Sequence, residues 1–201
     1  MQSSFEQTIK NFLPSGDERL DSLLKFSALA EEMDKISRRT KLADGSRRQN
    51  DAEHSWRIAL MALMFKDCFD GEVDATRAAA ICVTHDLVEI YAGDTFAYDA
   101  AANVGKEERE KMAADKLFGQ LPDDVSAKLR ALWNEFEEMK TPESRYANCM
   151  DRLEPFLNNT LAVDMAAVEK RAKPIKENMS RVWKWLFKSL ERGAEQGWIK
   201  K

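Results

Sequence analysis

The stretch Cys82–Asp94, CVTHDLVEIYAGD, decides the fold because it combines an apolar helical pattern with several ionisable side chains. His85 and Asp86 are adjacent, Glu89 follows three residues later, and Asp94 closes the segment after a glycine. Ionisable groups are costly to bury without partners. The segment therefore predicts a site in which other residues, or a cation, compensate these charges.

Outward from this stretch, helical spacing recurs along the chain, whereas alternating apolar and polar runs of the strand type are scarce. Hydrophobic residues make up 44% of the 201 residues and charged residues 33%, with only 8 Gly and 5 Pro. This balance is typical of a helical globular protein. We predict an all-α fold and a single domain spanning residues 1–201.

Several helices are expected from the position of apolar residues, caps and breakers. A segment at 37–53 contains many basic residues and an Asp-Gly-Ser turn signal, and we interpret it as a loop. The run HSWRIALMALMF that starts at His54 is apolar on nearly every side, which predicts a central, buried helix. The expected helices lie at about 5–13, 17–36, from 54, 75–91 with Gly93 as the C-terminal glycine, 106–116, after 124, from Thr141-Pro142, and in the amphipathic C-terminal segment.

Charge and cysteine use exclude some classes of protein. A net charge of -4 argues against sequence-independent binding to nucleic acid. The chain has no stretch of 18 apolar residues and no signal peptide pattern, so we expect no membrane span and no secretion. Three cysteines without CxxC spacing indicate buried thiols in a reducing compartment, and we predict the cytoplasm.

The two histidines of the chain each lie in or beside a strongly apolar helical segment. His54 stands at a helix start, His85 precedes Asp86 near the end of another helix, and Asp151 is a carboxylate within a third apolar helix. Two imidazoles and two carboxylates on buried helices can bind a divalent cation. The same four groups can also form a buried hydrogen-bond network, and the residue types alone favour neither interpretation.

The order His54, His85-Asp86 and Asp151 resembles the H…HD…D signature of the HD-domain metal-dependent phosphohydrolases. More narrowly, NDAEHSWRIALMA and HDLVEIYAGDTFAYD are similar to the small branch that contains the 5′-deoxynucleotidases. The pattern is specific because EHS, HDxxE, a following GD and a later MDR occur together. The similarity runs over about residues 23–160, and it implies an HD-type helical bundle with the metal site between core helices, on which an N-terminal helix and the C-terminal amphipathic helix pack.

The resemblance implies that His54, His85, Asp86 and Asp151 bind one divalent metal ion. It implies that an activated water attacks the phosphorus of a (deoxy)nucleoside 5′-monophosphate, so that the nucleoside leaves and phosphate is released. Two imidazoles with two carboxylates suit Mn, Co, Fe, Ni or Zn better than Mg. Glu89, one helical turn from His85, and Asp94, after the terminal glycine, are the candidate catalytic pair for handling protons.

Substrate contacts are expected from the basic segment before His54. Arg39 stands fifteen residues ahead of that histidine, a spacing that matches the substrate-contacting arginine of the nucleotidase branch. Arg47 is a further candidate for binding phosphate, and Phe96 is a candidate for lining the pocket. The chain departs from the bacterial nucleotidase at Thr40, where that branch has tryptophan, and this leaves the recognition of base and sugar open.

The residues and motifs that are missing from the sequence argue against several other functions. No P-loop or GxGxxG motif occurs, and two histidines are too few for a di-iron oxygenase of the HD type. Ile90 after Glu89 departs from the HDxxED pattern of alarmone hydrolases. A non-catalytic nucleotide- or protein-binding module with a structural metal, and a hydrolase of another small phosphoester, are the alternatives. The resemblance also implies a homodimer, for which the aromatic C-terminal helix offers a surface.

Overall fold

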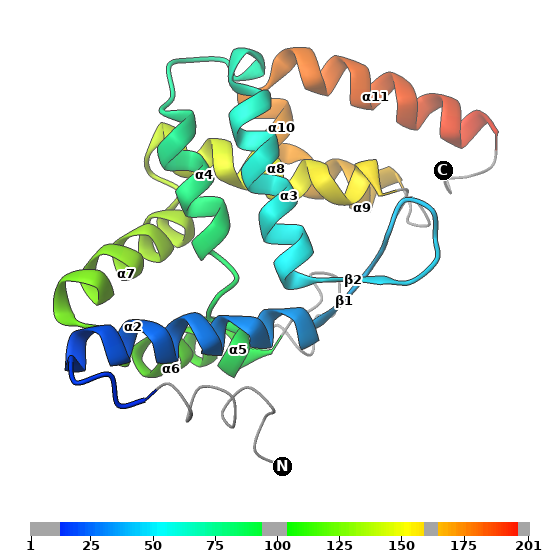
Figure 1. Ribbon diagram of the computed structural model, residues 1–201. Coiled ribbons are helices and arrows are strands. Elements are labelled where there is room, and N and C mark those ends of the chain that lie inside the picture. The colour runs from blue at the N-terminus through cyan, green and yellow to red at the C-terminus, as the bar shows by residue number, and fades with distance from the viewer. Residues whose placement is uncertain (1–12, 94–103, 159–164, 197–201) are drawn as a thin grey trace. The chain divides into compact units, whose positions relative to one another are not determined.

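The structure is a computed structural model that describes residues 13–93, 104–158 and 165–196. Helices predominate in this part of the chain (Figure 1), which confirms the predicted all-α class. The elements are α2 (Glu18–Leu29), the 3-10 helix η1 (Ala30–Lys35), β1 (Ser37–Lys41), β2 (Arg48–Asn50), α3 (Asp51–Met64), the 3-10 helix η2 (Lys66–Cys68), α4 (Ala75–Thr84), α5 (Glu89–Ala92), α6 (Lys106–Phe118), α7 (Asp123–Glu138), α8 (Pro142–Leu157), α9 (Met165–Arg171), α10 (Lys173–Asn178) and α11 (Ser180–Glu195).

The chain divides into two compact units. Unit 1 comprises Met1–Arg38, Asn50–Ala52 and Asp86–Ala131, and unit 2 comprises Arg39–Gln49, Glu53–His85 and Leu132–Lys201. The division falls between His85 and Asp86, inside the segment that the sequence singles out. This division into units does not test the predicted single HD domain with its core at about 23–160, which stays a prediction.

Unit 1 is built from α2, η1, α5, α6 and the first part of α7, and α5 packs against both α6 and η1. Helix α2 begins after Asp17, whose carboxylate accepts hydrogen bonds from the backbone N–H groups of Arg19 and Leu20. Helix α6 buries Ala114, Leu117 and Phe118 along one side. These contacts give unit 1 its apolar core.

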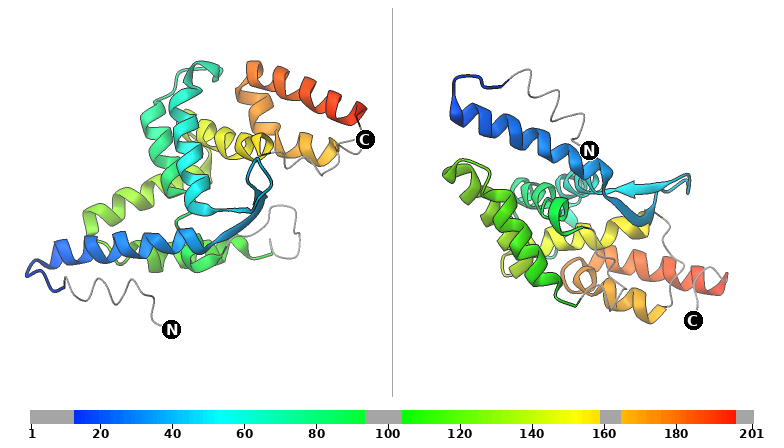
Figure 2. Two further views of the ribbon diagram at one scale, coloured as in Figure 1. Left: turned by 45° about the vertical axis from the view of Figure 1, so that its right-hand side comes forward. Right: turned by 90° about the horizontal axis from the view of Figure 1, so that it is seen from below.

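Unit 2 contains most of α3 together with α4, α8, α10 and α11. Helix α8 packs against α4 and α10, and α10 packs against α11, which Figures 1 and 2 show as the orange and red end of the chain. The Thr141-Pro142 start of α8 is confirmed: Thr141 and Ser144 form a capping box, with Pro142 in the first turn. Tyr146 is fully buried and donates a hydrogen bond to the carbonyl oxygen of Ala62 (2.8 Å). Helix α8 is thus the central helix of unit 2.

The predicted helix at 75–91 is interrupted. Helix α4 ends at Thr84, and α5 begins only at Glu89. Between them, the N–H of Glu89 donates to the carbonyl oxygen of Asp86 (2.9 Å), a bond that spans three residues and tightens the chain into a turn. Gly93 ends α5 with a φ of 75°, which confirms its role as the terminal glycine. The prediction that His85 and Glu89 share one helical face was therefore wrong.

The predicted loop at 37–53 contains the hairpin of β1 and β2, and helix α3 already begins at Asp51. The Asp-Gly-Ser signal does form the turn, with Gly45 at a φ of 72° and Leu42 N–H bonded to the carbonyl oxygen of Arg47 (3.0 Å). Sequence reasoning missed the strands because they are basic and contain few β-branched residues.

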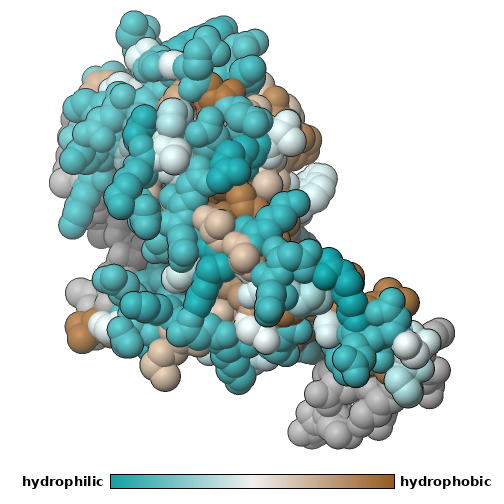
Figure 3. Space-filling model, turned by 90° about the vertical axis from the view of Figure 1, so that its left-hand side faces the viewer, coloured by the Kyte–Doolittle hydropathy of each residue, from teal (hydrophilic) through white to brown (hydrophobic). Residues whose placement is uncertain are grey.

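Helix α3 is buried on one face only, which contradicts the prediction of a helix buried on all sides. Ile58 and Ala62 are fully buried, whereas Trp56 is 68% exposed and Met64 is 66% exposed. In α2, Leu20 is 44% exposed. The face of the molecule drawn in Figure 3 is largely hydrophilic. Among the described residues, no helix has both the length and the apolar character needed to cross a membrane.

Candidate metal and catalytic site

His54 lies on α3 of unit 2, and its imidazole is fully buried. Its Nε2 is 3.1 Å from Oδ1 of Asp151 on α8, and its Nδ1 is 3.2 Å from Oε2 of Glu154 on the same helix. The structure thus brings together two of the four predicted ligands, His54 and Asp151. The imidazole stands between two carboxylates, one at each ring nitrogen.

His85 follows directly after α4, and its ring lies 5.6 Å from that of His54, centroid to centroid. Its Nδ1 is 2.8 Å from the carbonyl oxygen of Cys82. Because a carbonyl only accepts hydrogen bonds, Nδ1 carries a proton, and in the neutral ring the lone pair is on Nε2. Phe136 packs against the same ring at 4.7 Å between centroids. His85 is therefore held in the tautomer that a metal ligand of this kind requires.

Asp151 is ionised by its surroundings. Burial opposes ionisation, but the charge of Arg152, the hydrogen bond from His54 and the charges of the two imidazoles outweigh it. Together they hold the pKa of Asp151 well below its usual range. Asp151 thus presents an anionic carboxylate inside unit 2.

A second group of acidic side chains lies in unit 1. Asp51, Asp86 and Glu89 each offer a carboxylate oxygen, and these oxygens lie within 4.8 Å of one another. Arg38 on β1 donates from one guanidinium nitrogen to Asp51 (3.0 Å) and to Asp86 (2.9 Å). Burial and the charge of Asp86 raise the pKa of Asp51, against the effects of its hydrogen bonds with Glu89 and Arg38. We call these four residues the Arg38 cluster.

Glu154 was missed by sequence reasoning, although it is fully buried and contacts His54. Its other oxygen accepts hydrogen bonds from the side chains of Gln49 (2.8 Å), Arg57 (3.2 Å) and Asn158 (2.6 Å). We call these five residues the Glu154 network. The available signal was the position of Glu154 three residues after Asp151, one turn along the same helix.

The remaining predicted site residues are placed as follows. Arg39 is exposed on β1, while its neighbour Arg38 reaches the acidic cluster, as expected for successive residues of a strand. Arg47 is ion-paired with Glu53 at the surface. Asp94 and Phe96 lie outside the described residues. The catalytic and substrate-binding roles of all these residues stay predictions.

The residues around His54 fit a divalent metal ion. Ligand atoms about 2.1 Å from a tetrahedral or octahedral metal are roughly 3.0–3.4 Å apart. The 3.1 Å separation between His54 Nε2 and Asp151 Oδ1 falls within this range. Glu154, which accepts from the opposite ring nitrogen, supplies the second carboxylate that commonly orients a metal-binding histidine. A mixed set of imidazole and carboxylate donors suits a first-row transition ion.

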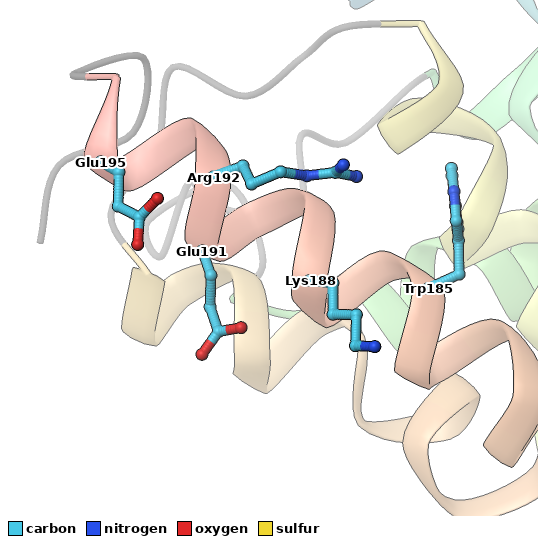
Figure 4. Close-up of a pocket in the computed structure, with 5 residues that line it drawn as sticks. All are labelled: Trp185, Lys188, Glu191, Arg192 and Glu195. Carbon is cyan, nitrogen blue, oxygen red and sulfur yellow. The ribbon is translucent and has the colours of Figure 1, made fainter.

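A surface hollow of about 310 Å³ lies on α11 and is lined by Trp185, Lys188, Glu191, Arg192 and Glu195 (Figure 4). Figure 4 shows these side chains spread along one side of the helix, with basic and acidic groups interspersed. None of them is a predicted site residue. The two histidines do not line this hollow.

Paired buried histidines and carboxylates on a helical scaffold define a class of metal-binding α-helical proteins. The model of the HD domain family matches residues 30–191, and the chain therefore belongs to this family. The comparisons with individual proteins extend the assignment to one branch of it.

The chain is 27% identical to the 5′-deoxynucleotidase HDDC2 of Xenopus laevis over 75% of this chain and 72% of that protein. It is 27% identical to the human protein of the same name, over 68% of this chain and 66% of that protein. Among solved structures, a predicted metal-dependent phosphohydrolase from Magnetospirillum magnetotacticum MS-1 superposes with a TM-score of 0.87 at 38% identity. That match covers 94% of this chain and 100% of the other. The resemblance predicted from the sequence is confirmed.

Proposed function

We propose that this chain removes phosphate from (deoxy)nucleoside 5′-monophosphates with the help of one divalent metal ion. The observation that carries the proposal is the buried pair formed by His54 Nε2 and Asp151 Oδ1, 3.1 Å apart, with His85 beside it. The relatives confirm the predicted class of enzyme, a metal-dependent phosphohydrolase of the HD family. Their names as 5′-deoxynucleotidases support the nucleotide substrate.

The proposed metal ligands are His54, His85, Asp86 and Asp151. Asp86 enters the set because it follows His85 directly in the chain. When bound, such an ion polarises a phosphoryl oxygen and lowers the pKa of a coordinated water. Mn, Co, Fe, Ni and Zn suit the ligands, with Mg less favoured.

The side chains then have distinct roles. Glu89 and Asp94 are proposed to take a proton from the attacking water and to give one to the leaving oxygen of the nucleoside. The support for Glu89 is that it is buried beside Asp51 and Asp86 in the Arg38 cluster. Arg39 and Arg47 are proposed to bind the phosphate through their guanidinium groups, and Phe96 to line the nucleoside pocket.

Phosphate release from a panel of nucleoside monophosphates tests the proposal. Metal-stripped protein receives Mn, Co, Zn or Mg, and is offered ribo- and deoxyribonucleotides with phosphate at the 5′ or 3′ position. We expect metal-dependent release from 5′-monophosphates only. Release from none of them by folded, metal-loaded protein would instead favour another phosphoester or a non-catalytic module. Comparing the two sugars also shows whether Thr40 relaxes sugar selection.

We also propose that the protein is a cytoplasmic homodimer. Two of the three predicted buried thiols, Cys82 and Cys149, are buried, whereas Cys68 is partly exposed. The two buried thiols support a reducing compartment, and burial raises the pKa of Cys149 to about 12, so that it stays protonated. Exposed aromatic residues support a dimer: Trp185 on α11 is 50% exposed, and Trp56 on α3 is more exposed still. Sedimentation at micromolar concentration should give the mass of two chains, and the mass of one chain would contradict the dimer.

A further inference from the structure

Glu154 divides its two carboxylate oxygens between different partners. Oε2 faces Nδ1 of His54 at 3.2 Å. Oε1 accepts three hydrogen bonds, from Gln49 Nε2 (2.8 Å), Asn158 Nδ2 (2.6 Å) and Arg57 (3.2 Å). Within the Glu154 network, Oε1 thus has three hydrogen-bond donors, and Oε2 has one partner, His54.

Three hydrogen bonds to Oε1 favour the ionised form of Glu154 although this residue is fully buried. Asn158 is itself oriented, because its amide oxygen accepts from Arg57 while its nitrogen donates to Glu154. The network therefore presents an anionic acceptor to His54.

An anionic oxygen beside Nδ1 of His54 decides where the ring proton lies. Nδ1 must carry the proton, since a carboxylate only accepts hydrogen bonds. By the same argument Nε2 donates to Asp151 Oδ1 (3.1 Å) while no cation is bound, and this Nε2 proton is the one that a cation would replace. Because Glu154 keeps the proton of Nδ1, Nε2 is the ring nitrogen left for a metal ion, beside the carboxylate of Asp151.

We propose that Glu154 is a positioning residue that fixes the Nδ1–H form of His54 and thereby makes Nε2 of this ring a metal ligand. The inference rests on the proposed function, because it concerns the same metal site. It adds a residue that contacts neither the substrate nor the metal and acts only through His54.

The substitution Glu154→Gln tests this role with little change in volume. The amide oxygen stays toward Gln49, Arg57 and Asn158, because reversing the amide would place its NH₂ against three donors. The NH₂ group then faces Nδ1 of His54, which must accept a hydrogen bond. The neutral ring then carries its single proton on Nε2, where it blocks the proposed metal-binding nitrogen.

The first measurement is the affinity for Zn and Mn, determined by competition with a chromophoric chelator. We expect Glu154→Gln to weaken metal binding by about 10–100-fold, the usual effect of losing the partner of a ligating histidine. Glu135→Gln is the matched control, since Glu135 is a mostly buried carboxylate of unit 2 that is bound to Arg77 and Thr141. It should retain the wild-type affinity. Equal affinity of wild type and Glu154→Gln would overturn the proposal.

The second measurement reads the tautomer directly and needs no metal. Histidine labelled with ¹⁵N gives two sets of ring signals, because the chain has 2 histidines. At about pH 9, above the usual imidazole pKa, Nδ1 of His54 should be protonated in the wild type and unprotonated in Glu154→Gln. His85 is an internal control, because the Cys82 carbonyl holds its Nδ1 proton in both proteins. A protonated His54 Nδ1 in both proteins would also overturn the proposal.

The two measurements separate failure of this inference from failure of the proposed function. If the wild type binds no metal, the metal site is refuted, while the NMR comparison still decides whether Glu154 sets the tautomer. If the wild type binds metal and hydrolyses nucleotides, yet Glu154→Gln changes neither affinity nor tautomer, only the role of Glu154 is refuted. Unfolding curves of both variants establish that the fold is intact.

Discussion

Two groups of buried acidic side chains, one in each unit, balance their charge in different ways. In the Arg38 cluster, a guanidinium donates to both Asp51 and Asp86, so a cation is built into the protein. Beside His54, Asp151 and Glu154 flank an imidazole, one carboxylate at each ring nitrogen. The comparison teaches that a guanidinium compensates buried carboxylates with a fixed charge, whereas an imidazole can exchange a ring proton for a metal ion.

The largest expected effect comes from Asp151→Ala, which removes the anionic donor beside His54. Phosphate release should fall to the rate of buffer alone, and metal affinity should fall by more than about 100-fold, since losing even an outer partner costs 10–100-fold. Chelator competition and phosphate assays measure the two quantities. Asp124→Ala removes an exposed carboxylate paired with Arg19 and should change neither. Retained metal affinity in Asp151→Ala would show that Asp151 is not a ligand.

Glu89→Ala separates catalysis from metal binding. Removing a proton-transfer group should lower kcat by about 10²–10⁴-fold, while the metal stays largely in place because His54, His85 and Asp151 are untouched. Kinetics and metal analysis of the same preparation test this. Glu107→Ala, at an exposed position on α6, is the control. Near-normal turnover of Glu89→Ala would refute the catalytic role of Glu89.

Arg38→Gln tests whether the Arg38 cluster depends on its internal cation. Asp51 and Asp86 would lose their guanidinium partner, and we expect the free energy of unfolding in urea to fall by about 3–5 kcal/mol, as when one member of a buried ion pair is removed. Arg39→Gln, at the exposed neighbour on β1, should change stability by less than about 0.5 kcal/mol. If the two variants lose equal stability, the contacts of Arg38 do not stabilise unit 1.

Arg47→Ala should have the smallest effect. Its ion pair with Glu53 is exposed, so the midpoint of unfolding should not change. KM should rise a few-fold without a change in kcat if Arg47 helps to bind phosphate. Steady-state kinetics decide between a substrate contact and a surface ion pair, because an unchanged KM would make the substrate-binding prediction wrong.

Much of the fold and part of the site could be predicted from the sequence. The cap at Thr141 and the terminal Gly93 are local signals, and His54 and Asp151 were recognisable as ionisable groups in apolar helices. The break after Thr84 was not predictable from apolar spacing, which continues across the turn. The contact of Gln49 with Glu154 joins residues 105 positions apart and follows only from tertiary packing.

Stepwise addition of Mn to metal-stripped protein, with phosphate release from a deoxynucleoside 5′-monophosphate as the readout, tests the central claim most directly. The account predicts no release without metal, and a rate that rises in proportion to metal and saturates at one ion per chain. Full activity in excess chelator, or tight binding of one ion without any release of phosphate, would contradict it.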